Sequence, residues 1–175
     1  IDSGTVASGH FDSRTFDLGL NAMLPSITFG ALSGDSVEVI LDKTMDVLAF
    51  RFRSARQGVG GGTFISGIEL TGKAYQDEVQ LRAGWKGSNN GTAGDLDLDA
   101  LVLNGHSVAI DLRPSTLFFG RGSWVNERTA HILVDTSSIR VDSLELRNED
   151  QYVMLDGTVS QDPKTPLNFD LRDVR

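Results

Sequence analysis

The chain has no cysteine, only four prolines, and an aromatic content of 7% in 175 residues. Without cysteine there can be no disulfide, no thiolate nucleophile and no cysteine-ligated metal. No segment approaches the ~20 consecutive apolar residues of a membrane-spanning helix, and none has the pattern of a signal peptide. The formal net charge is -8, with both signs scattered along the chain, which disfavours binding to nucleic acid.

The feature that dominates the sequence is an alternation of apolar and polar residues with a period of two. Such alternation predicts β-strands with one apolar and one wetted face, as do the frequent glycines and an apolar content of only 39%. We therefore expect a single all-β domain over residues 1–175, built of successive antiparallel hairpins with little or no helix. Because the chain begins at Ile1 without a methionine and ends within a strand pattern, we expect it to be a fragment of a longer protein.

The strands are expected to come as hairpins. Turns are predicted near residues 73–77, at Asn104-Gly105 and at residues 148–150; Asn-Gly is a strong tight-turn signal because both residues tolerate positive φ. The stretch from Met45 to Phe52 fits either a helix or a strand, and its neighbours favour the strand. The glycine-rich segments 57–62 and 87–94 are expected to be loops, the first of them a loop or a wide bulge.

Two segments resemble ligand-binding motifs without matching them. Gly58–Gly62 is followed by Thr63 and Phe64, not by the lysine and hydroxyl residue that a phosphate-binding loop needs. Asp95, Asp97 and Asp99 alternate as in a calcium loop, but the glycine and glutamate that such a loop requires are missing. Leucines between these aspartates indicate the wetted face of a strand instead.

No catalytic constellation is evident, so we expect no enzyme activity, no cofactor and no metal. His10, His106 and His131 lie far apart and have no partner at ligand or triad spacing. The apolar rows, together with Phe118, Phe119 and Trp124, are open to two interpretations: an ordinary sandwich core, or a lipid-binding groove. Periodicity alone does not separate them, because both need apolar residues on one face.

The C-terminal third, over roughly residues 117–174, resembles a known family. Ile139-Arg140-Val141-Asp142-Ser143-Leu144-Glu145-Leu146 leads into Asn148-Glu149-Asp150-Gln151, then Leu155-Asp156-Gly157-Thr158-Val159-Ser160, Asp162-Pro163 and Leu167-Asn168-Phe169-Asp170-Leu171. This order is similar to the translocation and assembly module TamB family of Gram-negative envelopes, which is related to AsmA-like and bridge-like lipid-transfer proteins, and especially to its Bacteroidetes-type members.

The resemblance implies a curved, open β-structure, described as a taco, with a continuous apolar interior. It implies a periplasmic location, in a parent anchored in the inner membrane by a segment outside this chain. It also implies passage of phospholipid between membranes, and a contribution to outer-membrane protein assembly with a barrel assembly factor of the TamA or BamA type as partner. We expect no nucleic-acid partner.

Under this hypothesis the groove is lined by the alternating apolar residues of several hairpins. They are Phe16, Leu18, Leu20, Val37, Val39, Leu41, Leu101, Leu103, Val108, Ile110, Leu144, Leu146, Val153, Leu155, Phe169 and Leu171. The alternative functions are a module that docks a barrel partner through strand edges, and a carbohydrate-binding domain that stacks sugars on Trp85 or Trp124. The low aromatic content disfavours the carbohydrate-binding domain.

Overall fold

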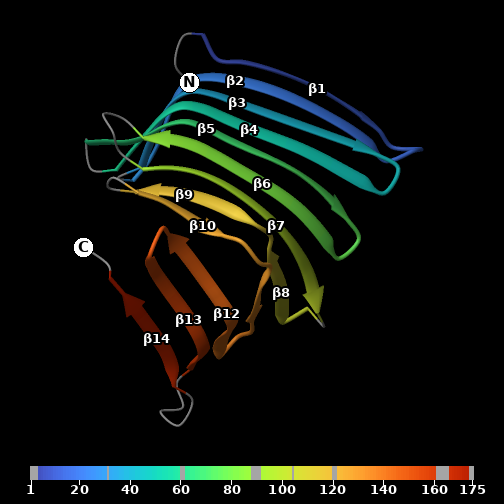
Figure 1. Ribbon diagram of the computed structural model, residues 1–175. Helices are drawn as coiled ribbons and strands as arrows, with labels where there is room; N and C mark the ends of the chain where they lie inside the picture. Colours follow the sequence, from blue (N-terminus) through green and yellow to red (C-terminus); the bar gives the residue numbers. More distant parts are fainter. Residues whose placement is uncertain are drawn as a thin grey trace.

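Fourteen strands and no helix are formed by the residues that the computed structural model describes, which are 4–30, 32–59, 62–87, 92–103, 105–119, 122–160 and 166–173. All strands pair antiparallel within one curved sheet (Figure 1). The strands are β1 (Val6–Asp12), β2 (Asp17–Phe29), β3 (Leu32–Thr44), β4 (Val47–Val59), β5 (Gly62–Tyr75), β6 (Glu78–Gly87), β7 (Ala93–Leu103), β8 (Ser107–Leu112), β9 (Ser115–Phe119), β10 (Gly122–Asn126), β11 (Ala130–Val134), β12 (Ser138–Asn148), β13 (Gln151–Ser160) and β14 (Leu167–Arg172). The predicted all-β fold is thus confirmed.

Short turns join most neighbouring strands. The β3–β4, β5–β6 and β12–β13 turns have two residues each, and the first of these, Met45, Gln76 and Glu149, have φ of 54°, 52° and 53°. Two-residue hairpin loops that match the sheet twist require this left-handed conformation. The turns expected near residues 73–77 and at 148–150 are therefore confirmed. Asn104 lies outside the described residues, and Leu103 pairs with Ser107 across that turn.

The stretch from Met45 to Phe52 is turn followed by strand, as its neighbours suggested. Its alternating apolar residues in β4 pair with β3 in register: Leu48 with Lys43, Phe50 with Leu41, and Phe52 with Val39. The two expected loops are shorter than predicted, because β4 continues to Val59 and β7 already begins at Ala93. A register shift at Gln57/Gly58 confirms the bulge, whereas residues 60–61 and 88–91 lie outside the described part of the chain.

The sheet is interrupted in its middle. β7 pairs with β8 through Leu98–Leu103 and with β9 through Ala93–Asp95, so β8 and β9 occupy successive parts of one strand position. β12 likewise pairs with β11 and, at Arg147, with β10. Pro114 lies between β8 and β9. Since proline has no N–H to donate, it ends the ladder there.

Two side chains replace the ladder hydrogen bonds at this interruption. Asn126 is 1% exposed, and its Nδ2 donates to the carbonyl oxygens of Leu112 and Arg113, each at 3.3 Å. The hydroxyl of Ser115 donates to the carbonyl oxygen of Arg113 at 2.7 Å and accepts from the backbone N–H of Asp97 at 3.2 Å. Buried backbone groups that lose a strand partner are thereby satisfied.

Irregularities in the ladder bend the sheet elsewhere. The β12–β13 register shifts between Val141 and Leu144, where Ser143 has a φ of 54°. The β5–β6 register shifts between Ser66 and Glu69, next to Gly67 with a φ of 57°. β-bulges of this kind bend a strand and increase its local twist, which accounts for the curvature.

Candidate functional site: the apolar face of the sheet

One face of the sheet, hereafter the apolar face, carries apolar side chains in rows that run across the strands. Cross-strand partners point to the same side of a sheet, so the register identifies each row. The middle row is Leu20, Leu41, Phe50, Gly72, Leu81, Leu98, Leu112 and Ala130. The row nearer the β3–β4 turn is Leu18, Lys43, Leu48, Ala74, Val79, Ala100, Ile110, Ile132 and Val141.

The rows continue on both sides of these two. A third row is Ala22, Val39, Phe52, Leu70, Ala83 and Leu96. In the C-terminal strands Leu144, Leu155 and Phe169 are paired, as are Leu146, Val153 and Leu171. The apolar face therefore extends across the sheet from β2 to β14.

The apolar face is largely uncovered. Among the described residues only four apolar side chains are buried: Val37, Trp124, Ala130 and Val141. The accessible surface of the molecule is 11918 Å², whereas a compact monomer of this mass, 18.9 kDa, has about 8,300 Å². A sandwich with a closed core would bury this face against a second sheet. The sequence left open whether the apolar rows form a closed sandwich core or an open groove. The structure has the open form.

Aromatic rings lie over glycines on the apolar face. A Cβ atom built on Gly72 would lie 2.3 Å from Cζ of Phe50, and one built on Gly94 would lie 2.4 Å from the ring of Trp85. An aromatic ring laid over a glycine compensates for the side chain that the glycine lacks. The glycines thus leave room for the rings of Phe50 and Trp85 to lie over the neighbouring strand.

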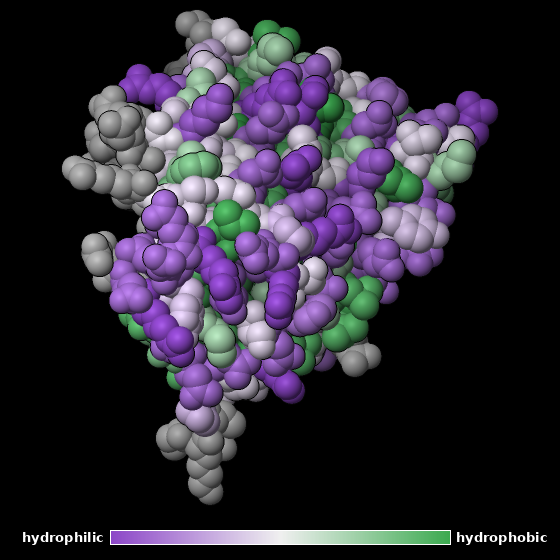
Figure 2. Space-filling view, viewed as in Figure 1, coloured by the Kyte–Doolittle hydropathy of each residue, from purple (hydrophilic) through white to green (hydrophobic). Residues whose placement is uncertain are grey.

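The opposite face carries the charges, including the three alternating aspartates of β7. Asp95 pairs with Arg82 at 3.2 Å, while Arg113 lies 3.9 Å from Asp97 and hydrogen bonds to Asp99. The hydrogen bond that Arg113 donates to Asp99 raises the pKa of Arg113. The interpretation of these aspartates as a wetted strand face is confirmed. Figure 2 shows a side of the molecule on which hydrophilic residues predominate.

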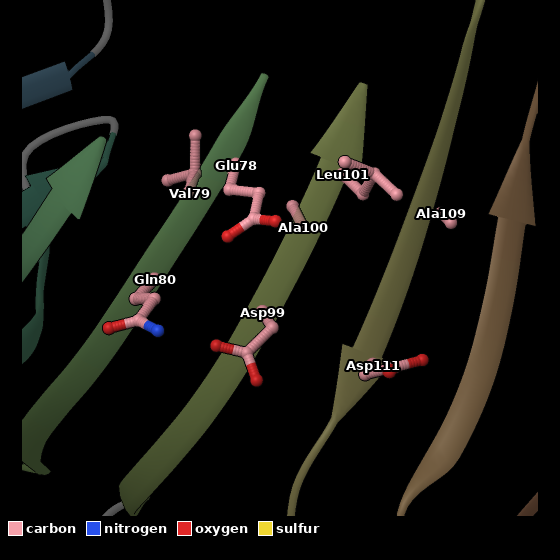
Figure 3. A pocket seen from close by; sticks show the side chains of 8 residues that line it. All are labelled: Glu78, Val79, Gln80, Asp99, Ala100, Leu101, Ala109 and Asp111. Carbon is pink, nitrogen blue, oxygen red and sulfur yellow. The ribbon is translucent and has the colours of Figure 1, made fainter. Parts of the chain in front are cut away.

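A shallow depression of about 300 Å³ involves β6, β7 and β8. It is lined by Glu78, Val79, Gln80, Asp99, Ala100, Leu101, Ala109 and Asp111. Its acidic groups come from three different strands and are spread along them (Figure 3). Within the described part of the chain, no three His, Cys, Asp or Glu side chains are grouped so that they could hold a metal ion. We therefore assign no chemistry to this depression.

Most of the residues predicted to line a groove do lie on the apolar face. They are Leu18, Leu20, Val37, Val39, Leu41, Val108, Ile110, Leu144, Leu146, Val153, Leu155, Phe169 and Leu171. The cross-strand pairs Leu144–Leu155 and Leu146–Val153 bring the C-terminal members together.

Three predicted residues lie elsewhere. Leu101 and Leu103 are on the opposite face, because Ala100 is in the row of Val79 and side chains alternate along a strand. Phe16 is not in a strand: it lies in the β1–β2 turn with a φ of 59° and is 63% exposed. Leu101 is followed by Val102 and Leu103, and in such a continuous apolar run the pattern does not indicate which residues face which side.

Several residues of the apolar face were not among those predicted. Leu96 and Leu98 alternate with the aspartates of β7. This alternation was sufficient to predict that both leucines lie on the apolar face. Trp124 was among the aromatic residues left open between a core and a groove, and it lies on the apolar face, because it pairs with Leu117, which pairs with Gly94. Its burial, at 3% exposed, results from the interruption of the sheet, where β9 and β10 form a separate hairpin.

One histidine has a partner that its sequence spacing did not predict. Nδ1 of His131 lies 2.6 Å from Oδ1 of Asp111, on neighbouring strands β11 and β8. Both side chains are exposed, at 63% and 49%. The pair belongs to the polar surface of the opposite face.

Comparisons with family models, with curated proteins and with solved structures find no match for this chain. In the described residues no helix is long and apolar enough to cross a membrane.

Proposed function

We propose that the chain is a non-enzymatic segment of a periplasmic, TamB-like envelope protein that shields phospholipid acyl chains on its apolar face. The observation that carries this proposal is the apolar face itself, continuous from β2 to β14 and largely uncovered. Monomeric soluble proteins rarely expose apolar patches larger than a few hundred Å², and larger ones mark interaction or ligand-binding surfaces. The sequence resemblance in the C-terminal third supports the same function.

An uncovered apolar face suits acyl chains for a physical reason. Each methylene moved out of water gains about 0.8 kcal/mol, whatever its exact position along the face. Rows of Leu, Val, Ile and Phe offer similar contacts all along the sheet. A lipid would therefore be held by the apolar surface that it buries, wherever it lies on the sheet. It could slide along the face, as transport between membranes requires.

A pair of neighbouring substitutions tests the proposal. Leu70→Asp places a carboxylate on the apolar face between Phe52 and Ala83. Thr71→Asp places the same group on the opposite face between Arg51 and Arg82, where it is tolerated. We expect native mass spectrometry to detect phospholipid on the unmodified chain and on the Thr71→Asp variant, and much less on the Leu70→Asp variant.

The stability of each variant is followed by thermal unfolding, and Ile139→Asp serves as a second variant on the apolar face. Ile139 is already 43% exposed, so its substitution perturbs the fold less. Phospholipid that binds both apolar-face variants as well as the unmodified chain would contradict the proposal.

The edge strand β14 supports a second candidate function, docking of an outer-membrane barrel assembly factor. Every residue of β14 is exposed, and it pairs on one side only, with β13. Unpaired strand edges recruit partner strands by main-chain hydrogen bonding. Thr158 donates its backbone N–H to Pro166, so in the next pair, Gly157–Leu167, the N–H of Leu167 points away from β13. Leu167→Pro removes this N–H from the free edge, so a reduction in barrel binding with lipid binding retained would favour docking.

A further inference from the structure

One charged side chain interrupts the apolar rows. Lys43 occupies the row nearer the β3–β4 turn, between Leu18 of β2 and Leu48 of β4. Among the residues of the rows defined above, Lys43 is the only one with an ionisable side chain. A cation on an otherwise apolar ligand-binding face fixes the orientation of a ligand, because such sites combine many apolar contacts with a few placed polar groups.

The ammonium group of Lys43 is held at the rim of the sheet by backbone atoms. Nζ donates to the carbonyl oxygen of Met45 at 2.5 Å and to that of Phe16 at 3.1 Å. An ammonium has three N–H donors, so one is left. In the described part of the chain, no carboxylate lies within ion-pairing distance of Lys43. The charge is thus positioned without a direct ion pair.

Asp17 interacts electrostatically with Lys43, but its oxygens are engaged in other bonds; hydrogen bonds from Thr15 and Met45, and then the charge of Lys43, lower its pKa. Asp17 accepts the backbone N–H of Met45 through Oδ1 at 3.2 Å, and the hydroxyl of Thr15 through Oδ2 at 2.8 Å. The bond from Met45 links the β3–β4 turn to the start of β2, and the bond from Thr15 links the β1–β2 turn to the same carboxylate. Lys43 is therefore a cation on this part of the rim whose position is set by hydrogen bonds to both turns.

The two residues whose carbonyl oxygens accept from the ammonium have exposed apolar side chains. Phe16 is 63% and Met45 is 77% exposed, and both have the positive φ that bulky residues rarely adopt. Backbone strain of this kind persists only where the surroundings impose it. At Met45 the two-residue β3–β4 turn requires it, and the hydrogen bonds from Lys43 to the carbonyl oxygens of Phe16 and Met45 join the two turns at the edge of the apolar face.

We propose that Lys43 binds the phosphate group of a phospholipid whose acyl chains lie along the strands of the apolar face; this inference rests on the proposed lipid function. The dimensions agree. Val39 lies four positions before Lys43, a span of about 14 Å along an extended strand. One leaflet of a membrane has a hydrocarbon thickness of about 15 Å. The acyl chains can therefore lie over Leu41 and Val39 with the headgroup at the turns.

Binding measurements on the full chain test this assignment. The probes are dioleoylphosphatidylethanolamine, dioleoylglycerol, which has the same chains without the phosphate, and inorganic phosphate alone. Lys43→Met removes the charge and keeps an unbranched apolar stem, and Lys43→Arg restores the charge. Lys73→Met is the matched control, since Lys73 is exposed and lies on the opposite face, where it pairs with Ala49 and Gln80.

We expect Lys43→Met to weaken binding of the phospholipid about tenfold, the loss typical of one charge-assisted hydrogen bond at a partly exposed site. Binding of dioleoylglycerol should change less than about twofold by the same measure, because it makes no such bond. Lys43→Arg and Lys73→Met should bind both lipids like the unmodified chain. In the unmodified chain, high salt should weaken binding of the phospholipid but not of dioleoylglycerol.

Three results would overturn the assignment. An equal loss of both lipids in Lys43→Met would show that Lys43 acts only by holding the turns, and would leave the lipid function intact. Inorganic phosphate that binds at Lys43 without competing with phospholipid would point to a site for the free ion. If neither lipid binds the unmodified chain, the proposed function fails and the assignment with it.

Discussion

Replacement of Asn126 tests whether side chains hold the sheet together where β8 and β9 are interrupted. Asn126→Ala removes both hydrogen bonds to the carbonyl oxygens of Leu112 and Arg113. Asn126→Asp keeps the shape of the side chain but replaces its donor with an acceptor. Asn21→Asp is the matched control, because it is the same substitution at an exposed position of β2.

The magnitudes follow from burial. Two hydrogen bonds of about 1 kcal/mol each are lost in Asn126→Ala, for a total of about 2 kcal/mol, and the carbonyl oxygen of Arg113 keeps the hydroxyl of Ser115 as a donor. At neutral pH Asn126→Asp places a carboxylate without a partner at a site that is 1% exposed. An uncompensated buried charge costs about 3–5 kcal/mol. We therefore expect Asn126→Asp to be the less stable of the two at pH 7.

The pH dependence gives a second test. Burial raises the pKa of the carboxyl introduced by Asn126→Asp above its unfolded value of about 3.9. The neutral carboxyl, present below that pH, can donate one hydrogen bond to a carbonyl oxygen. Stability relative to the unmodified chain is then highest near pH 4 and is lost as the pH rises through the folded-state pKa.

Urea unfolding at pH 4.5 and pH 7, followed by tryptophan fluorescence, measures these differences. The reasoning is refuted if Asn126→Asp is as stable as Asn21→Asp at pH 7. It is refuted equally if the stability of Asn126→Asp relative to the unmodified chain is the same at both pH values.

Three further perturbations have defined outcomes. The backbone N–H of Ser137 and nearby serine groups lower the pKa of Asp135 to about 2, below its unfolded value of about 3.9. This stabilisation is present above pH 4 and is lost towards pH 2, so the difference between the unmodified chain and Asp135→Asn in urea unfolding should shrink over that range; a constant difference would contradict this. Gly157 has a φ of 121°, and a Cβ there would lie 2.4 Å from the carbonyl oxygen of Pro166, so Gly157→Ala should cost about 1–3 kcal/mol and speed amide exchange in β14. Trp124 is 3% exposed, so Trp124→Ala should cost about 3–5 kcal/mol, and a loss below 1 kcal/mol in urea unfolding would show that the β9–β10 hairpin is not packed as described.

Local patterns in the sequence are sufficient for the strands and several of their turns. Period-two alternation fixes strands wherever each apolar residue has polar neighbours, as in Leu96 and Leu98 of β7. Short turns between such runs can close only antiparallel pairs. Both signals depend on residues that are close in the chain, so an all-β fold of hairpins follows without knowledge of distant contacts.

Tertiary structure decides which side a side chain faces where that alternation fails. Leu101 and Leu103 belong to an apolar run, and only the pairing of Ala100 with Val79 and Ile110 places them on the opposite face. Phe16 continues the alternation of β2 in the sequence, yet the turn takes it out of the strand. In both cases the register of a neighbouring strand supplies the missing information.

The sequence by itself therefore determined the class of fold, most of the hairpins and most of the residues of the apolar face. Only the tertiary structure decided that this face stays open, that Asn126 and Ser115 satisfy the backbone where the ladder stops, and that Lys43 meets the carbonyl groups of two separate turns. Alternation is local, because each residue's face depends on its immediate neighbours. Curvature, coverage and the meeting of two turns depend on bulges and pairings between distant residues, which no local pattern encodes.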